Sequence, residues 1–299
     1  MRIVVTGASG FIGKELCYKL LERGHEVVGL CRTSGALGAA YPESFRHIPY
    51  VMGAVLPEEV LRFAPAALVH LAWDGIPDFS ERRCVDNVES QLRFLKETEN
   101  LGQMKKMVGA GTCREYGAKQ GACAESDRVP PDSYFSWAKQ TLAEYLRLMC
   151  QQQQISLVWF RIFYIYGPGQ RAESLIPTLI QAFKSKQNPE IKNPSAANDF
   201  IHIDDVVSAF VKAIEDEDCQ GTFNLGSGKT TPVAKIAEMV EQTIRKDSQF
   251  STQLAIKLDG GKSNSGMWAD TTLSGRHLGW TPQISLVDGI GRTYRSTVT

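Results

Sequence analysis

The hydrophobic pattern changes its period within the first two dozen residues of the chain. Apolar or β-branched residues run without interruption over 3–6, as in a strand that is buried on both faces. From Phe11 to Leu21 the apolar positions recur at helical spacing. A second predicted strand follows over 26–30. The pattern predicts a strand, a tight turn, a helix and a second strand.

The same alternation continues to about residue 165 and then loosens. We expect strands over 45–50, 66–71, 104–110 and 155–160, and helices from 58, over 80–100 and over 132–150. Such alternation is typical of an α/β fold with a Rossmann-type doubly wound parallel sheet. Beyond it we expect helices over 174–186, 204–215 and 232–245, the second capped by Asp204 or Asp205, with short strands over 199–203 and 222–225. We therefore expect a dinucleotide-binding domain over 1–165 and a smaller α/β C-terminal substrate-binding region over 166–299, which can interleave with the first.

Three glycines fill the first turn, at Gly7, Gly10 and Gly13. In a dinucleotide site the first glycine permits the turn, the second lets backbone N–H groups approach a pyrophosphate, and the third lets the helix pack close to the strand. The partial positive charge of the helix N-terminus then faces the anion. The alternative is a glycine turn without a ligand, but the strand before it and the helix after it favour the dinucleotide interpretation.

The composition of the chain limits the kinds of partner and the cellular location that we expect. The 299 residues include 33 basic and 33 acidic ones, so the totals give no reason to expect nucleic acid binding. We expect no membrane span, because no apolar run reaches the ~18 residues that one needs. The chain enters its first strand directly, so we expect no signal peptide and a cytoplasmic protein. The seven cysteines form no CxxC pair, which favours reduced thiols, and we expect no metal site.

The end of the second strand bears on the cofactor. An acidic residue near this place binds the ribose 2′-OH in NAD-binding versions of the fold, but this chain has Cys31 and Arg32. A guanidinium pairs well with a 2′-phosphate, so we favour NADP(H) over NAD, although Arg32 can also be a solvated surface residue. His70 lies at the carboxyl end of a strand, where ligands gather, but a structural histidine is the favoured interpretation.

Several motifs in order now resemble the extended short-chain dehydrogenase/reductase family, in its nucleotide-sugar branch. They cover almost the whole chain and are Thr6-Gly7-Ala8-Ser9-Gly10-Phe11-Ile12-Gly13, His70-Leu71-Ala72, Asn87-Val88, residues 112–117, Lys139, Arg161 with Tyr166-Gly167-Pro168, residues 199–205, residues 223–228 and Leu278-Gly279-Trp280. The resemblance implies an NADP(H) site lined by the glycine turn and by Ser9, Phe11, Ile12, Leu71, Ala72 and Tyr164.

The resemblance also assigns the chemistry. In the family a Ser or Thr binds the substrate oxygen, a Tyr exchanges a proton with it, and a Lys four residues after the Tyr binds the nicotinamide ribose and lowers the tyrosine pKa. Thr112 and Lys139 take the first and third places. An asparagine in the long helix usually supports the lysine, and Asn87 fits that place.

The tyrosine place holds Phe135, four residues before Lys139. Phe135 can be a substitution that traps a complex, or it can be native and mark a binding protein or a very slow enzyme. In a third interpretation Tyr134 serves as the acid with the helix shifted, which is the least favoured because one residue turns a helix by ~100°. The first is favoured, since the other site positions suit catalysis.

The reactions common on this scaffold are 4,6-dehydration, epimerisation and ketoreduction. Cys113 and Arg114 stand where the similar dehydratases have Asp-Glu, and Glu115 should point away from the sugar. Arg32 argues against the tightly bound NAD of C4 epimerases. The resemblance therefore implies NADPH-dependent reduction at C4 of a nucleoside-diphosphate 4-keto-6-deoxyhexose. A nucleotide-sugar 4-epimerase and a catalytically silent cofactor- and nucleotide-sugar-binding protein remain as alternatives.

The remaining site candidates concern the substrate and the assembly. We expect the sugar nucleotide to meet Trp73, Cys113, Arg114, Tyr164, Arg171, Asn198 and Lys262. The helices over 80–100 and 132–150 resemble those of a four-helix dimer contact in relatives, so we expect a homodimer. The apolar residues predicted for the outer helix faces that form that contact are Phe94, Leu142 and Leu146. The alternative is that these three side chains are buried within one subunit.

Overall fold

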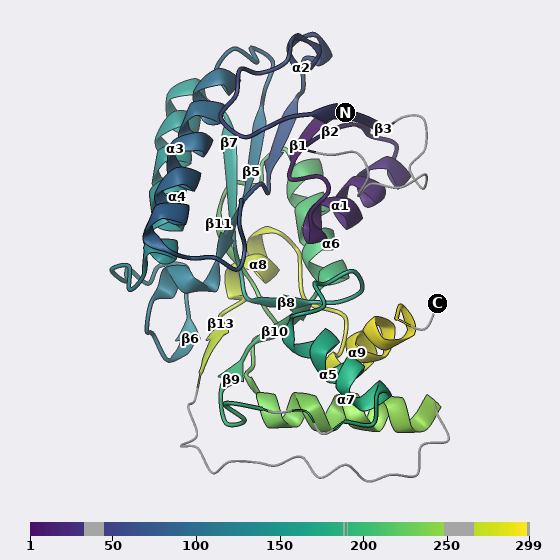
Figure 1. Cartoon of the computed structure of the whole chain (residues 1–299). Coiled ribbons are helices and arrows are strands. Elements are labelled where there is room, and N and C mark those ends of the chain that lie inside the picture. Colours follow the sequence, from purple (N-terminus) through teal and green to yellow (C-terminus); the bar gives the residue numbers. More distant parts are fainter. Residues whose placement is uncertain (33–44, 188, 190, 248–265, 298–299) are drawn as a thin grey trace.

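A parallel sheet of seven strands organises the computed structural model, which describes residues 1–32, 45–187, 189, 191–247 and 266–297 (Figure 1). Its strand order is β11-β7-β5-β4-β1-β2-β3, and every neighbouring pair is parallel. The strands are β1 (Arg2–Thr6), β2 (Glu26–Cys31), β3 (Phe45–Pro49), β4 (Ala67–His70), β5 (Lys106–Thr112), β7 (Ser156–Ile162) and β11 (Gly221–Leu225). The chain adds strands to one side of β1 first, as β2 and β3, and then to the other side, as β4, β5, β7 and β11. Doubly wound sheets bind ligands at the point where this order changes direction.

Helices cover both faces of this sheet (Figure 1). The helices α1 (Phe11–Glu22) and α6 (Ile203–Glu215) pack side by side on one face, and α3 (Glu81–Thr98) and α4 (Tyr134–Gln153) pack side by side on the other. Alternate residues of β1 serve the two layers. Ile3 and Val5 join the core under α1 and α6, whereas Val4 joins the core under α3 and α4. This explains the unbroken apolar run of β1, because both of its faces are buried.

Most of the described chain outside this sheet and its helices forms a second part beside the carboxyl ends of the strands (Figure 1). Its core lies between α5 (Leu175–Lys184), α7 (Val233–Asp247) and α9 (Leu286–Arg295). Three short pairs of strands lie outside the seven-stranded sheet: β8 (Tyr164–Tyr166) with β10 (Phe200–His202), β9 (Ala197–Asn198) with β12 (Thr231–Pro232), and β6 (Gly121–Cys123) with β13 (Met267–Ala269). Three short helices pack on the first part: α2 (Glu58–Phe63) joins the core under α3 and α4, α8 (Thr272–His277) contacts β11, and the 3-10 helix η1 (Cys113–Tyr116) contacts α4. The chain returns to the first part after residue 200, because α6 covers the sheet and β11 extends it.

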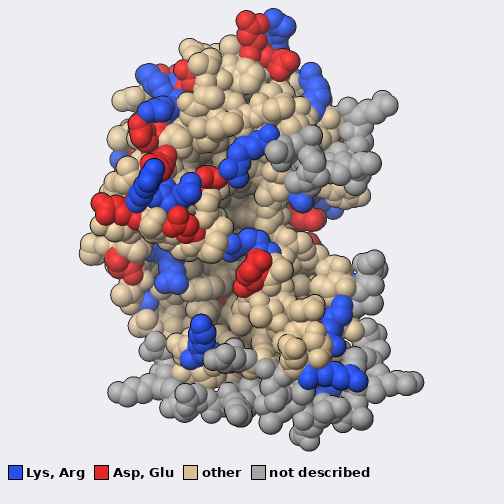
Figure 2. Space-filling view, viewed as in Figure 1, with Lys and Arg blue, Asp and Glu red and all other residues tan. Residues whose placement is uncertain are grey.

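Figure 2 shows acidic and basic side chains interspersed over one face of the molecule, with a hollow near its middle. Among the helices that the structure describes, none combines the length and the apolar character that a bilayer crossing requires.

Two sequence predictions about α6, α3 and α4 are wrong. The N-cap of α6 is His202, whose Nδ1 accepts a hydrogen bond from the Asp204 N–H at 3.2 Å, so neither aspartate caps the helix. The side chains of Phe94, Leu142 and Leu146 do not lie on outer helix faces, because 0–1% of each residue is exposed and all three pack under α3 and α4 against the sheet. Burial within one subunit, the alternative for these residues, is what the structure shows.

Candidate functional site

The glycine turn after β1 leaves no room for a side chain at Gly7 or Gly13. Gly7 has a φ of +68°, and a Cβ on Gly13 would lie 2.2 Å from the Gly7 carbonyl oxygen. Gly10 is the N-cap of α1 and has no side chain that could accept from the first-turn N–H groups, which therefore point to solvent or to a ligand. Ser9, Phe11 and Ile12 lie in or directly after this turn. A pyrophosphate fits such a turn.

The end of β4 is tied to the end of β1 beside this turn. The Leu71 and Ala72 N–H groups both donate to the Thr6 hydroxyl at 3.2 Å. The same hydroxyl bonds His70 Nδ1 at 3.0 Å, and His70 Nε2 bonds Gln91 Oε1 at 2.9 Å. Burial lowers the pKa of His70 to about 4, so the imidazole is neutral. Its two satisfied nitrogens support the structural interpretation of this histidine.

Three candidates of the reaction centre come from two neighbouring elements. Thr112 is the last residue of β5, and Phe135 and Lys139 lie one turn apart near the start of α4, which a Ser133 capping box fixes. Lys139 Nζ donates to the Ala110 carbonyl at 2.9 Å and lies 4.4 Å from the centre of the Trp73 ring. Burial lowers the pKa of Lys139 to about 8, and the negative charge of Glu115 opposes this shift.

Phe135 and Tyr134 face different surroundings. The Phe135 ring lies 5.2 Å from the Trp73 ring and 4.4 Å from the Phe79 ring, centre to centre. Tyr134 is half exposed, and its hydroxyl lies against Glu81 of α3, which raises the tyrosine pKa through a hydrogen bond. The helix register thus points Phe135 toward Lys139 and Trp73, and points Tyr134 toward solvent.

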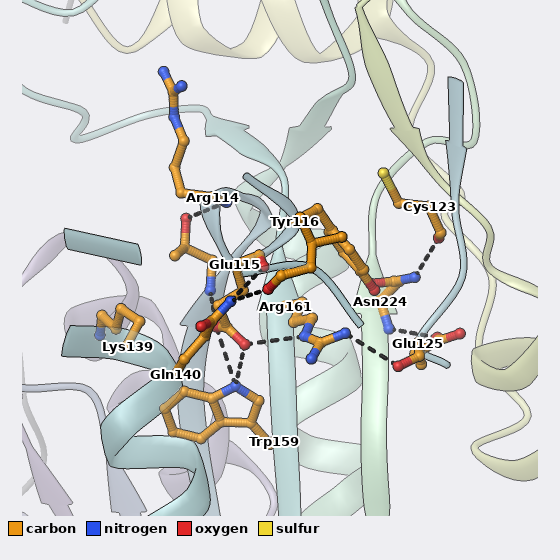
Figure 3. A network of polar contacts seen from close by, with 12 residues as sticks. Arg114, Glu115, Tyr116, Cys123, Glu125, Lys139, Gln140, Trp159, Arg161 and Asn224 are labelled. Atoms are coloured by element: carbon orange, nitrogen blue, oxygen red, sulfur yellow. Dashed lines mark hydrogen bonds and ion pairs between the residues drawn. The ribbon is translucent and has the colours of Figure 1, made fainter. Parts of the chain in front are cut away.

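A network of buried polar side chains holds the loop that follows Thr112 (Figure 3). Glu115 has a fully buried side chain that accepts from the Thr112 N–H at 2.9 Å and from Arg161 Nε at 3.0 Å. Trp159 Nε1 donates to both carboxylate oxygens of Glu115. Arg161 continues the network to the Glu125 carbonyl, and its guanidinium lies 4.7 Å from the centre of the Tyr116 ring. Glu115 therefore fixes the backbone of Thr112, and its side chain is buried among Thr112, Trp159 and Arg161.

The side chains next to Thr112 divide between interior and surface. Cys113 is buried, and burial raises the pKa of its thiol to about 12, so it stays protonated. Arg114 is exposed, points away from the network in Figure 3, and lies 6.0 Å from the centre of the Tyr164 ring in β8. The structure thus brings Arg114 and Tyr164 together at the Thr112 end of β5.

The loop between β4 and α3 gathers several further groups. Asn87 accepts from the Asp74 N–H at 2.8 Å and donates to the Asp74 carbonyl at 3.0 Å, so in this structure it holds the loop, whereas the Ala110 carbonyl holds Lys139. Arg171 Nη1 donates to the Ile76 carbonyl at 3.1 Å, which brings the second part of the chain to this loop.

Of the other predicted positions, Arg32 reaches the same loop, whereas Asn198 does not join this group. Arg32 follows β2, and its side chain, which is 70% exposed, pairs with the Asp74 carboxylate at 2.8 Å. Asn198 is in β9 and pairs with Thr231 of β12 within the second part. Lys262 lies outside the described residues.

Trp73 has an open hydrogen-bonding position. Among the described residues its buried indole Nε1 finds no hydrogen-bond partner. A buried donor without a partner is unfavourable by ~1–3 kcal/mol, and a ligand acceptor would satisfy it. Sequence reasoning did not single out Asp74, Phe79 or the support that Glu115 gives to Thr112, because these contacts join residues that are distant along the chain.

The glycine turn, the buried lysine and the parallel sheet fit what comparisons with known proteins find. A family profile described as the NAD dependent epimerase/dehydratase family matches residues 3–226, from β1 to just past β11. The chain belongs to this family. The resemblance to extended short-chain dehydrogenases/reductases and the prediction of a Rossmann-type sheet are confirmed.

Relatives of this family member include both reductases and epimerases. The chain is 26% identical over 314 aligned residues to a dTDP-4-dehydro-6-deoxyglucose reductase of Escherichia coli, with 98% of this chain and 96% of that one covered. The structure of UDP-glucose 4-epimerase from Thermotoga maritima with UDP-glucose matches with a TM-score of 0.84 at 22% identity, over 100% and 99% of the two chains. UDP-glucuronic acid 4-epimerase from Bacillus cereus, solved with NAD, matches at 0.82 and 23%, over 99% and 98%.

Proposed function

We propose that this chain binds a nicotinamide dinucleotide and a nucleoside-diphosphate 4-keto-6-deoxyhexose, and that its site is built for reduction of the sugar at C4. The observation that carries the proposal is the placement of Thr112, Phe135 and Lys139 where β5 ends and α4 begins. The relative named dTDP-4-dehydro-6-deoxyglucose reductase supports the reaction, and the structures with UDP-glucose and with NAD support the two ligand classes.

The cofactor site consists of two groups of residues. The pyrophosphate meets Gly7, Gly10 and Gly13 with Ser9, Phe11 and Ile12, because the N–H groups at the start of α1 are free to bind it. Leu71 and Ala72 form the adjoining wall, and Lys139 and Tyr164 lie toward the nicotinamide end. Asn87 acts on this site by holding the β4–α3 loop.

The residues of the reaction centre have distinct tasks. A bound nicotinamide supplies the hydride for C4. The Thr112 hydroxyl donates a hydrogen bond to the C4 oxygen, where negative charge grows, and the Lys139 ammonium donates hydrogen bonds to the ribose hydroxyl oxygens. Phe135 has no proton to give. The chain with Phe135 therefore binds both ligands but catalyses the reduction slowly. Trp73, Cys113, Arg114 and Tyr164 surround the sugar, and Arg171, Asn198 and Lys262 are the candidates for the diphosphate side.

Cofactor preference is the finer part of the proposal. Arg32 stands where NAD-binding relatives of this fold carry an acid, and a guanidinium recognises a 2′-phosphate in two-pronged fashion. We therefore propose NADP(H) as the preferred cofactor.

A second candidate is a binding protein without turnover, and Phe135 is the observation that favours it. In this structure the Phe135 ring packs against Trp73 and Phe79, as a purely structural residue would. A 4-epimerase remains the third candidate, since the epimerase structures share the fold.

An assay on the Phe135→Tyr variant separates these candidates. NADPH oxidation is followed with CDP-, dTDP- and GDP-4-keto-6-deoxyhexoses, and UDP-glucose with NAD serves as the epimerase arm. We expect NADPH oxidation with one of the keto sugars and no conversion of UDP-glucose. Conversion of UDP-glucose without net NADPH oxidation would support the epimerase. Binding of NADPH and keto sugar without any reaction in the variant would support the binding protein.

A further inference from the structure

The sequence has no acidic residue at the end of β2, but the structure brings the carboxylate of Asp74 to this place. Asp74 follows β4 and Arg32 follows β2, the two strands that flank β1 and its glycine turn. Arg32 Nη1 lies 2.8 Å from Asp74 Oδ1. The pair therefore sits at the carboxyl edge of the sheet beside the turn, which is where this fold places the adenosine ribose.

Asp74 is the fixed member of the pair. Asn87 binds both its backbone N–H and its carbonyl, at 2.8 and 3.0 Å. Arg83 Nη1 holds the second carboxylate oxygen at 2.6 Å, and the Arg83 side chain packs so closely on Gly75 that a Cβ there would lie 2.6 Å from Nε. Arg32 instead has a side chain that is 70% exposed, so it can leave Asp74 at little energetic cost.

Both members retain hydrogen-bonding capacity for a ligand. Within the part of the chain that the structure describes, each oxygen of Asp74 has one arginine partner, and a carboxylate oxygen can accept two hydrogen bonds. A guanidinium has five N–H donors, and among the described residues the ion pair with Asp74 employs one of those of Arg32. A ribose hydroxyl can therefore donate to Asp74, and a ribose phosphate can accept from Arg32.

We propose that Arg32 and Asp74 form a two-way ribose site that accepts both NAD(H) and NADP(H). Asp74 receives the 2′-OH of NAD(H), and Arg32 receives the 2′-phosphate of NADP(H). Because the phosphate must share Arg32 with the Asp74 carboxylate and lies near its negative charge, Asp74 restrains the preference for NADP(H) that Arg32 provides. The inference rests on the dinucleotide site of the proposed function.

Replacing Asp74 and replacing Arg32 should change the preference between NADH and NADPH in opposite directions. Asp74→Asn removes a charge-assisted hydrogen bond to the 2′-OH, so the NADH Kd should rise about 10-fold, whereas the NADPH Kd stays or falls. Arg32→Ala should raise the NADPH Kd about 10- to 100-fold and leave the NADH Kd within about 3-fold. Asp78→Asn is the matched control, because Asp78 lies in the same loop at 3.5 Å from Arg83 Nε.

Titration calorimetry of the full chain with NADH and NADPH at pH 7 measures these constants without any turnover. We expect the parent chain to bind both cofactors. The ratio of the two Kd values should move at least about 10-fold toward NADPH in Asp74→Asn, and Asp78→Asn should keep the ratio of the parent chain. Circular dichroism confirms that each variant is folded, and Arg32→Ala, an exposed change, keeps the test valid if Asp74→Asn unfolds.

Three results would overturn the inference. An unchanged ratio in Asp74→Asn would show that Asp74 does not meet the ribose. A weaker NADPH affinity in Asp74→Asn would show that Asp74 only orients Arg32 for the phosphate, and an unchanged ratio in Arg32→Ala would show that Arg32 does not meet the phosphate. A native protein that binds neither cofactor would instead overturn the dinucleotide site itself, and the inference with it.

Discussion

At the residue scale, Lys139 links the local environment to ligand binding. Its ammonium is buried beside the Trp73 ring and donates to the Ala110 carbonyl, and burial lowers its pKa from 10.5 to about 8. A ribose that accepts hydrogen bonds from the charged form binds best below that pKa, and its binding raises the pKa in the complex.

We therefore expect cofactor affinity to be full below pH 8 and to fall as the pH rises above about 8. Lys139→Met should weaken binding by about 1.5–3 kcal/mol at pH 7 and should abolish this pH dependence. Calorimetric titration between pH 6 and 10 measures both effects, with Lys235→Met, an exposed change on α7, as the control. A pH dependence that persists in Lys139→Met would assign it to another group.

At the element scale, the Glu115–Arg161 pair joins η1 to β7 and holds the Thr112 backbone in place. Glu115→Gln leaves the largely buried guanidinium of Arg161, whose side chain is 17% exposed, without its counter-charge, so the free energy of unfolding should fall by up to about 3–5 kcal/mol. The double variant Glu115→Gln with Arg161→Met should lose less, because it removes both charges. Urea denaturation measures these values.

The control for this prediction is Glu144→Gln on α4, since Glu144 is 54% exposed and pairs with Arg147. It should change stability by less than about 1 kcal/mol. Equal losses in the single and the double variant would show that the charge pair does not govern the stability of η1.

The elements themselves could be predicted from the sequence, because their apolar periods are strong. The strand and helix periods at 3–6 and 11–21 correspond to β1 and α1. The His202 cap was missed because histidine is not among the preferred N-cap residues. The faces of Phe94 and Leu142 were missed because an amphipathic helix has one apolar stripe, and the pattern does not say whether a sheet or a partner covers it.

The candidate site was predictable only where a motif carries it. Gly7 and Thr112 could be located by their motifs, whereas the pairing of Asp74 with Arg32 depends on how the β4–α3 loop folds over the edge of the sheet. The partner of Asn87 likewise differs from the family expectation, because that side chain binds the Asp74 backbone.

At the scale of the whole molecule, the homodimer stays a prediction, with other contact residues. The outer faces of α3 and α4 expose Val85 at 43% and Leu148 at 50%. If these faces pair, light scattering at micromolar concentration gives twice the mass of one chain, and Val85→Arg with Leu148→Arg gives a monomer. Leu61→Arg on α2, where Leu61 is 40% exposed, should leave the dimer intact. A native monomer would contradict the prediction.

The central claim is that both parts of the molecule form a complete reduction site except for the proton at position 135. Phe135 faces Trp73 and lies one turn from Lys139, while Tyr134 faces solvent. General acid catalysis is typically worth 10²–10⁴-fold, or roughly 3–5 kcal/mol of the barrier. Phe79→Tyr adds a hydroxyl to the same aromatic cluster and is the matched control.

The measurement is single-turnover NADPH oxidation with the keto sugar that binds, together with the Kd of that sugar, in the chain with Phe135 and in Phe135→Tyr. We predict that Phe135→Tyr raises the rate by about 10²–10⁴-fold and changes the Kd by less than about 3-fold, and that Tyr134→Phe in that background has little effect. No gain in Phe135→Tyr, or loss of activity in Tyr134→Phe, would contradict the account.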